Sequence, residues 1–286
     1  MPLYLVSTPI GNLEDITLRA VRVLRDEVAL IACEDTRQTQ KLLEHYQIRK
    51  PLLSYHDHNE MTRAAEILQA LERGDSVALV SDAGTPLVSD PGYRLVTAAV
   101  EKGFPVIPLP GPSAVLAALA ASGLPTDQFR FIGFLPHKAG ARRRLLQDLA
   151  DESATVIAYE SPHRIFETLA SMAELFGERP LVLARELTKL HEEFLRGSAA
   201  FILQTLENRG SVKGEITLVI GRGEQRAEVQ DPLEEISKLQ NEAGLDRMEA
   251  IKAVAKRMGL PKREVYRLAA ERDSNRSSTP GPRQQK

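Results

Sequence analysis

The sequence predicts an α/β protein with two α/β lobes, followed by a small C-terminal helical module. Three observations support this prediction. Short apolar runs alternate with amphipathic stretches over most of the chain, which is typical of βαβ units whose helices cover a mostly parallel sheet. Pro, His, Lys and Gly interrupt this alternation near residue 137, and beyond residue 223 only helical patterns remain. A length of 286 residues also suits two domains and an appendage.

The first lobe is expected to span residues 1–136. Short apolar segments bounded by Gly, Pro or Asp predict strands at residues 3–7, 28–33, 76–81 and 105–109. Apolar residues spaced three and four apart predict the intervening helices at residues 15–24, 36–46, 61–71 and 91–100. A further helix at residues 113–121 is almost entirely Ala, Leu and Val, so we expect it to be buried.

The second lobe is expected to span residues 137–223. The same criteria predict helices at residues 139–149, 165–176 and 199–206. They predict strands at residues 155–159, 181–184 and 216–220. Each lobe should therefore have its own sheet and its own core.

The helical module is expected at residues 233–272, with helices at 233–242, 247–258 and 262–271. Gly259 and Pro261 separate the last two helices, as in a helix-turn-helix. Residues 224–246 carry a local net charge of −5, whereas residues 247–272 carry +5. A basic module of this kind favours contact with nucleic acid, although a cap packed on the body with solvated charges would give the same pattern. Residues 273–286 are expected to be disordered.

Composition and absent motifs exclude several classes of protein. The only cysteine, Cys33, rules out an internal disulfide and is expected to be a buried thiol. No apolar stretch is long enough to cross a membrane and no basic leader begins the chain, so we expect a cytoplasmic protein. His56 and His58 flank Asp57, but without a further His cluster we predict a polar loop and no metal site. The absence of a Walker loop, GxGxxG, GxSxG and HExxH argues against kinases, Rossmann dehydrogenases and zinc hydrolases.

Four unusual loops follow predicted strands of the first lobe. They contain the motifs TPIGNLED, CEDTR, SDAGTPLVSDPG and PLPGPSA. Open α/β sheets bind ligands at the carboxyl ends of their strands, so four such loops at one edge predict a ligand cleft. Any single loop also has a purely structural explanation, since Gly and Pro form turns and Asp90 or Ser113 could cap a helix.

These motifs, together with FIGFLP at residues 131–136, resemble the tetrapyrrole-methylase (class III) superfamily of methyltransferases, and more narrowly its members that act on ribosomal RNA. The likeness runs from about residue 3 to residue 223, and the helical module also matches the RNA-acting members. It implies a two-lobed enzyme, usually a homodimer, with S-adenosylmethionine in the cleft between the lobes. It also implies methylation of the ribose 2′-hydroxyl of a cytidine in the decoding region of small-subunit (16S) ribosomal RNA.

The resemblance also implies which residues bind the cofactor. By their places in matching motifs, these are Pro9, Asp82, Gly84, Thr85, Leu87, Ser113, Ala114, Phe134, Ala184 and Thr217. At the position where the tetrapyrrole-modifying members have a Gly-Asp-Pro pattern, this chain has Ser81-Asp82-Ala83. The Asp is therefore retained. The extra basic module favours a macromolecular substrate. Two alternatives stay open: a small-molecule tetrapyrrole methylase, and a non-catalytic RNA-binding factor for ribosome assembly.

Methyl transfer from a sulfonium needs the acceptor oxygen, the methyl carbon and the sulfur nearly in line, so positioning dominates and no metal is required. A ribose hydroxyl is a weak nucleophile, and a general base or a cation should help. Strand-end candidates are Asp35, Arg37, Glu186 and Lys189. An ion-pair network between the lobes, for example Arg37 with Glu186, would explain the same residues. Phosphate contacts are expected from Arg142, Arg143, Arg144, Lys262, Arg263 and Arg267.

Overall fold

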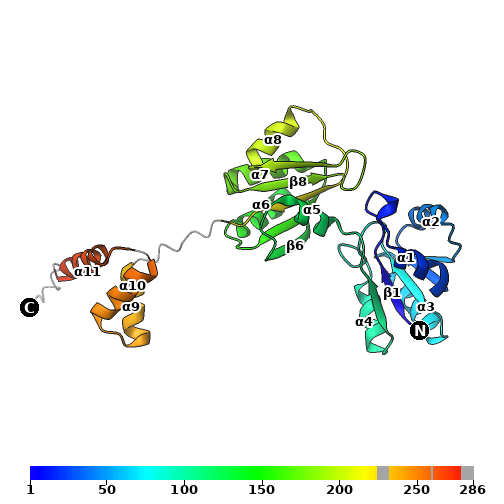
Figure 1. Cartoon of the computed structure of the whole chain (residues 1–286), viewed down its shortest axis with the longest axis horizontal. Helices are drawn as coiled ribbons and strands as arrows, with labels where there is room; N and C mark the ends of the chain where they lie inside the picture. The colour runs from blue at the N-terminus through cyan, green and yellow to red at the C-terminus, as the bar shows by residue number, and fades with distance from the viewer. Residues whose placement is uncertain (224–231, 259, 278–286) are drawn as a thin grey trace, which may run out of the picture. The chain divides into compact units, whose positions relative to one another are not determined.

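The computed structural model describes residues 1–223, 232–258 and 260–277 (Figure 1). The chain divides into two compact units, residues 1–223 and residues 224–286. The larger unit contains two five-stranded sheets, and the smaller unit is helical where it is described. The α/β architecture with two lobes and a C-terminal helical module is therefore confirmed.

The sheet of the first lobe is entirely parallel. Its strands, in spatial order, are β3 (Leu52–Ser54), β2 (Leu30–Cys33), β4 (Val77–Val80), β1 (Leu3–Val6) and β5 (Val106–Leu109). Every neighbouring pair runs in the same direction. The carboxyl ends of all five strands consequently lie at one edge, where the four predicted loops begin.

Helices cover both faces of this sheet. In β4, Ala78 and Val80 pack into one buried cluster, whereas Val77 and Leu79 pack into another. The first cluster is closed by α1 (Leu18–Arg22) and α2 (Thr36–His45), and the second by α3 (Glu60–Glu72) and α4 (Tyr93–Glu101). Burial on both faces explains why these strands are continuous apolar runs. Cys33 is a buried free thiol, as predicted.

The second lobe contains a mixed sheet. Its strands, in spatial order, are β6 (Phe129–Phe134), β7 (Thr155–Glu160), β10 (Ile216–Ile220), β8 (Leu181–Arg185) and β9 (Glu193–Gly197). Only β6 and β7 are parallel; β10 is antiparallel to both of its neighbours, and β9 is antiparallel to β8. One face packs on α6 (Ala139–Asp148), α7 (Ile165–Phe176) and α8 (Ala199–Glu207).

The opposite face of the second sheet packs on α5 (Ala114–Ser122), the buried Ala- and Leu-rich helix. Val115, Ala118 and Leu119 of α5 lie in one cluster with Ile157 of β7 and Val219 of β10. Although α5 follows directly on β5 of the first sheet, it buries its apolar side against the second sheet. This helix therefore joins the two lobes.

The structure corrects the expected lobe boundary and adds three strands. Strand β6 belongs to the second sheet, so a lobe boundary at residue 137 falls one strand too late. The Pro136–Gly140 signal marks the turn from β6 to α6, and the chain passes from the first sheet to the second between β5 and β6, by way of α5. Strands β3, β6 and β9 were not predicted: β3 has only three residues, β6 is only partly buried, and β9 is a polar edge strand.

The smaller unit contains α9 (Pro232–Ala243), α10 (Arg247–Met258) and α11 (Lys262–Ser277), close to the predicted ranges. Ile236, Ile251, Val254 and Val265 are among the residues of its buried core. Helix α11 extends to Ser277, so residues 273–277 are helical and not disordered; no Pro or Gly interrupts the sequence before Pro280. The rest of the predicted tail, residues 278–286, lies outside the described residues. No helix in the described ranges has the length and apolar character to cross a membrane.

Candidate active site

Hydrogen bonds join the loops at the carboxyl edge of the first sheet. Thr8 and Gly84 exchange two backbone hydrogen bonds of 2.9 Å, which fasten the loop after β1 to the loop after β4. The side chain of Thr85 donates to the carbonyl of Pro112 in the loop after β5, at 3.2 Å. The backbone N–H of Asp35, after β2, donates to the carboxylate of Asp82 at 3.0 Å. The four loops therefore form one connected rim.

A cavity of about 390 Å³ opens beside this rim, which is within the usual size range for small-molecule sites. The first lobe contributes Ile10, Asp82, Ala83, Gly84, Thr85, Val88, Ser89, Asp90, Ser113 and Ala114 to its wall. The second lobe contributes Phe134, Tyr159, Glu160, Ser161, Pro162, Gly214, Glu215, Ile216 and Thr217. The cavity thus lies between the two sheets, where the cleft was predicted.

Most of the residues predicted to bind the cofactor line this cavity. They are Asp82, Gly84, Thr85, Ser113, Ala114, Phe134 and Thr217. Pro9 instead lines a neighbouring cavity of about 250 Å³, which shares Asp82 with the first. Leu87 and Ala184 line neither of these cavities: Leu87 packs against the core of the first lobe, and Ala184 is fully buried beneath α5. Their apolar side chains are used for packing, and their assignment to the cofactor stays a prediction.

The loop after β4 holds an unusual backbone. Gly84, Leu87, Ser89 and Gly92 all have positive φ angles, at 85°, 71°, 68° and 137°. Leu and Ser rarely adopt this conformation, which costs of order 1–3 kcal/mol per residue and is concentrated at functional sites. At Gly84 a side chain would be strained and would lie 3.4 Å from Ile10, so glycine permits the exchange of hydrogen bonds with Thr8.

Asp90, on the same loop, is the most perturbed carboxyl at the cavity. Burial raises its pKa to about 7, and the negative charges of Glu34, Asp82 and Asp57 raise it further in the same direction. In the part of the chain that the structure describes, no residue donates a hydrogen bond to this carboxylate. Asp90 does not cap α4 either, since Gly92 occupies the N-cap position. Sequence reasoning considered Asp90 only as a cap and missed it as a site residue.

Aromatic rings form part of the wall on the side of the second lobe. Tyr159 makes edge-to-face contacts with Phe131 and Phe134, with ring centroids 5.0 and 5.3 Å apart. Burial raises the pKa of Tyr159 to about 12, with a further contribution from the charge of Asp90. Tyr159 is therefore a neutral hydroxyl at physiological pH. It was also missed by sequence reasoning, because an aromatic residue at the end of a strand gives no distinct signal.

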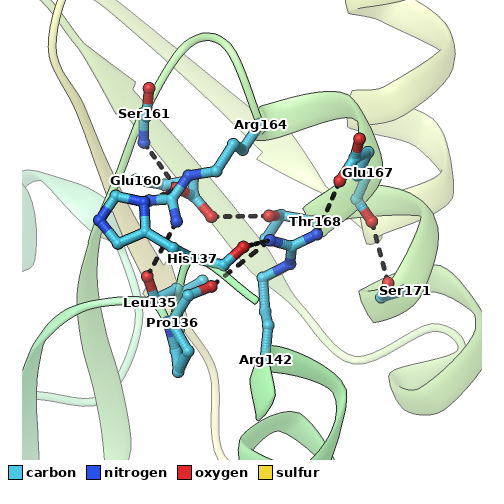
Figure 2. Close-up of polar contacts among 10 residues, drawn as sticks. All are labelled: Leu135, Pro136, His137, Arg142, Glu160, Ser161, Arg164, Glu167, Thr168 and Ser171. Atoms are coloured by element: carbon cyan, nitrogen blue, oxygen red, sulfur yellow. Dashed lines mark hydrogen bonds and ion pairs between the residues drawn. The ribbon is translucent and has the colours of Figure 1, made fainter. Parts of the chain in front are cut away.

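A buried charge network supports this wall (Figure 2). The Glu160 carboxylate, which is fully buried, pairs with Arg164 at 2.6 Å and accepts hydrogen bonds from the Thr168 hydroxyl and the Ser161 N–H, each at 2.6 Å. Arg164 also donates to the carbonyl of Leu135 at 3.3 Å. The network therefore joins the end of β7, the start of α7 and the segment after β6.

Arg142 lies beside this network and has its own set of partners (Figure 2). Its side chain is only 2% exposed, and it donates to Glu167 at 2.9 Å and to the carbonyl of Pro136 at 3.4 Å. The expectation that Arg142 contacts RNA is therefore wrong, because a guanidinium buried against the lobe cannot reach a phosphate. Its neighbour Arg143 pairs with Glu174, and Arg144 is exposed. In the smaller unit, Lys262, Arg263 and Arg267 lie on exposed positions of α11.

The catalytic candidates form two local clusters, and not the network between the lobes that was the alternative explanation. Asp35 caps α2 and pairs with Arg37 at 2.8 Å. The hydrogen bonds from Arg37 lower the pKa of Asp35 to about 2, which makes Asp35 a poor base. No ion pair between Arg37 and Glu186 occurs in the described residues.

Glu186 and Lys189 lie in the loop after β8. Lys189 contacts Glu186 at 2.8 Å and Glu215 at 3.0 Å, and the hydrogen bond from Lys189 lowers the pKa of Glu186. A side chain at Gly11 would overlap that of Lys189, so the loop after β1 contacts this cluster directly. The pair therefore lies where the lobes meet and beside Glu215 of the cavity wall.

Known proteins resemble this chain in both sequence and fold. The family model of tetrapyrrole (corrin/porphyrin) methylases matches residues 2–202. The chain belongs to this family. It is therefore a methyltransferase, and its lobes have the expected fold. The structure of cobalt precorrin-4 methyltransferase aligns with 77% of this chain and with 94% of its own chain, at 18% identity and a TM-score of 0.57. Uroporphyrin-III-C-methyltransferase from Thermus thermophilus aligns with a TM-score of 0.54 at 22% identity.

Closer relatives are proteins named ribosomal RNA small subunit methyltransferase I. The one from Halalkalibacterium halodurans is 47% identical, and the match covers 93% of each chain. The one from Synechocystis is 48% identical, over 96% of this chain and 99% of its own length. Within the methylase family, this chain is thus a member of the ribosomal RNA small subunit methyltransferase I group. No group of three or more His, Cys, Asp or Glu side chains suited to a metal occurs among the described residues, those near His56 included.

Proposed function

We propose that this protein is an S-adenosylmethionine-dependent methyltransferase that methylates the ribose 2′-hydroxyl of a cytidine in the decoding region of 16S ribosomal RNA. The observation that carries the proposal is the similarity to ribosomal RNA small subunit methyltransferase I over 93–96% of the chain. The tetrapyrrole methylases of known structure align with only 77% of it. The relatives named for RNA methylation therefore match the cavity together with much of the rest of the chain.

The cavity between the lobes fits S-adenosylmethionine. Its volume of about 390 Å³ suits a ligand of this size, and Ile10, Ala114 and Phe134 offer apolar surface. Asp82 and Glu215 add negative charge, which complements the positively charged sulfonium and amino groups of the cofactor. A Thermus thermophilus uroporphyrin-III C-methyltransferase was solved with S-adenosyl homocysteine, which is the demethylated form of this cofactor.

The chain's own residues would hold the cofactor and shape the cleft. Thr85, Ser113 and Thr217 offer hydroxyls for its polar groups, and the Gly84 backbone can approach closely because it lacks a side chain. When bound, the cofactor supplies an activated methyl group. Tyr159 and Phe134 form an aromatic wall that keeps part of the cavity dry. Positioning of this kind provides effective concentrations far above those in solution.

RNA would be held by exposed basic side chains, with Arg144 on the second lobe and Lys262, Arg263 and Arg267 on α11 as candidates. Phosphate contacts of this type give affinity without reading sequence, so the folded small subunit would select the nucleotide. Replacement of Lys262 and Arg263 by Ala should weaken RNA binding at low salt and reduce the slope of log affinity against log salt by about 1 for each phosphate that is no longer neutralised. Equal salt slopes in filter-binding titrations would remove these two residues from the interface. A cytoplasmic location and a homodimer complete the proposal.

The decisive test is transfer of a labelled methyl group from S-adenosylmethionine to small ribosomal subunits from a strain that lacks the gene. Digestion to nucleosides should show one additional 2′-O-methylated cytidine, absent from the untreated subunits. Calorimetry with S-adenosylmethionine tests the cofactor separately. Binding without transfer to RNA would favour a small-molecule methylase, and absence of binding would favour a non-catalytic assembly factor. Either result would reject the proposal.

A further inference from the structure

Asp90 has no structural task in this fold that would explain its position. It does not cap α4, no described residue donates a hydrogen bond to it, and it forms no ion pair within the described ranges. A partly buried carboxyl without a partner is costly, and such groups are concentrated at functional sites. The fold nevertheless holds it in the cavity wall, on a loop with four positive φ angles within nine residues.

The groups around Asp90 favour the protonated form of its carboxyl. Glu34 after β2, Asp82 after β4 and Asp57 after β3 all act on it with negative charge. The second lobe adds Tyr159, a neutral hydroxyl, and Glu215 to the same cavity, whereas the carboxylate of Glu160 is already paired with Arg164. No basic group acts on Asp90 in the described part of the chain.

The other carboxyls near the cleft are worse suited to accept a proton. The pKa of Asp35 is about 2, and Glu186 is paired with Lys189, which lowers its pKa. Glu160 is engaged by three donors. A general base works best when its pKa is near the working pH, and Asp90 meets this condition with a pKa of about 7.

We propose that Asp90 is the general base of the methyl transfer, and that it accepts the proton of the ribose 2′-hydroxyl in the cavity between the lobes. This assignment rests on the proposed function. The Asp90 carboxylate takes the hydroxyl proton, and the electron pair of the oxygen forms the new bond to the methyl carbon. The carbon–sulfur bond breaks with its electron pair remaining on sulfur, which loses its positive charge. Asp90 then releases the proton to solvent.

The first test compares Asp90→Asn with the intact enzyme on small ribosomal subunits. The amide has nearly the same shape but cannot accept the proton, so kcat should fall about 100-fold or more, whereas calorimetry should give a Kd for S-adenosylmethionine within about threefold. Retention of more than a tenth of kcat would overturn the assignment. So would a large loss of cofactor affinity, which would make Asp90 a binding residue.

The second test uses pH and does not require the Asp90 variant to fold. A base must be ionised to act, so log kcat/KM for the cofactor should rise with unit slope below about pH 7 and level off above it. Glu34→Gln and Asp57→Asn remove repulsion from Asp90, so each should move this midpoint to lower pH while leaving the plateau unchanged. Glu101→Gln, an exposed carboxyl on α4, is the matched control and should leave the midpoint in place.

These outcomes separate the inference from the proposed function. If the intact enzyme transfers no methyl group to the small subunit, the proposed function fails. If the intact enzyme is active and its midpoint is the same in Glu34→Gln, Asp57→Asn and Glu101→Gln, then Asp90 is not the base although the proposed function stands.

Discussion

Two carboxyls line the same cavity but have opposite environments. Glu160, from the second lobe, has an arginine, a hydroxyl and a backbone N–H as partners. Asp90, from the first lobe, is acted on only by negative charges within the described residues and lies on a strained loop. The difference indicates that the second lobe supplies a rigid wall in which the buried charge has partners. In the first lobe, a carboxyl without partners and a strained loop lower the stability of the fold at the site of the reaction. Four substitutions test this comparison.

The largest effect is expected at Glu160. Glu160→Ala leaves the mostly buried Arg164 guanidinium without its carboxylate partner, which should lower the free energy of unfolding by about 3–5 kcal/mol. Urea denaturation followed by circular dichroism measures this decrease. The control is Glu174→Ala, which breaks the exposed pair with Arg143 and should cost less than about 1 kcal/mol. Similar decreases in both variants would show that the buried network has no special role.

Asp82 should affect ligand binding more than stability. Asp82→Ala removes a carboxylate from the cavity wall and the acceptor of the Asp35 N–H, so the Kd for S-adenosylmethionine should rise about 10-fold to 100-fold. Calorimetry on the full chain measures this Kd. Asp57→Ala, which removes a charge from the same edge but not from the cavity wall, should change the Kd by less than about threefold. An unchanged Kd in Asp82→Ala would exclude Asp82 from the cofactor site.

Gly84→Ala should cost about 1–2 kcal/mol, because φ is 85° and the new methyl group would contact Ile10. We expect part of this cost as weaker cofactor binding, since the strain lies at the rim. Gly74→Ala provides the control: its φ is 95°, but nothing lies within 4 Å of the added carbon. Thermal unfolding with and without cofactor compares the two. If the cofactor raises the melting temperature of both variants equally, the rim does not depend on Gly84.

The smallest effect is expected on the stability of Asp90→Asn, and it should be a gain. Since the folded state raises the pKa of Asp90, the unfolded state binds fewer protons between about pH 4 and pH 7, so ionisation destabilises the fold as the pH rises. Asp90→Asn should therefore be more stable than the native chain at about pH 8, by about 1 kcal/mol or less because the group is partly exposed. At about pH 4 the two should be equal. A decrease in stability at the higher pH would show that Asp90 has a structural partner after all.

The sequence predicts the first lobe better than the second for a physical reason. Strands buried on both faces, such as β4, are continuous apolar runs, and their parallel arrangement places all following loops at one edge. The edge strand β9 is antiparallel and polar, and it gives no such signal. The motif loops identified most of the cavity wall. Asp90 was not predicted as a site residue because Asp-Pro-Gly is typical of the start of a helix. Arg142 was misassigned to RNA because burial of one Arg within Arg142–Arg144 depends on the tertiary fold.

Helix α5 has a consequence for the dynamics of the enzyme. Its first residue, Ala114, lines the cavity beside Ser113, while the following turns are packed against β7 and β10. A hinge motion between the sheets would therefore shift the cofactor-facing end of α5, and a ligand that binds one hinge angle more tightly would bias that angle. Amide hydrogen exchange in α5 should slow when the cofactor binds, including at Leu119 and Ala120, which do not line the cavity.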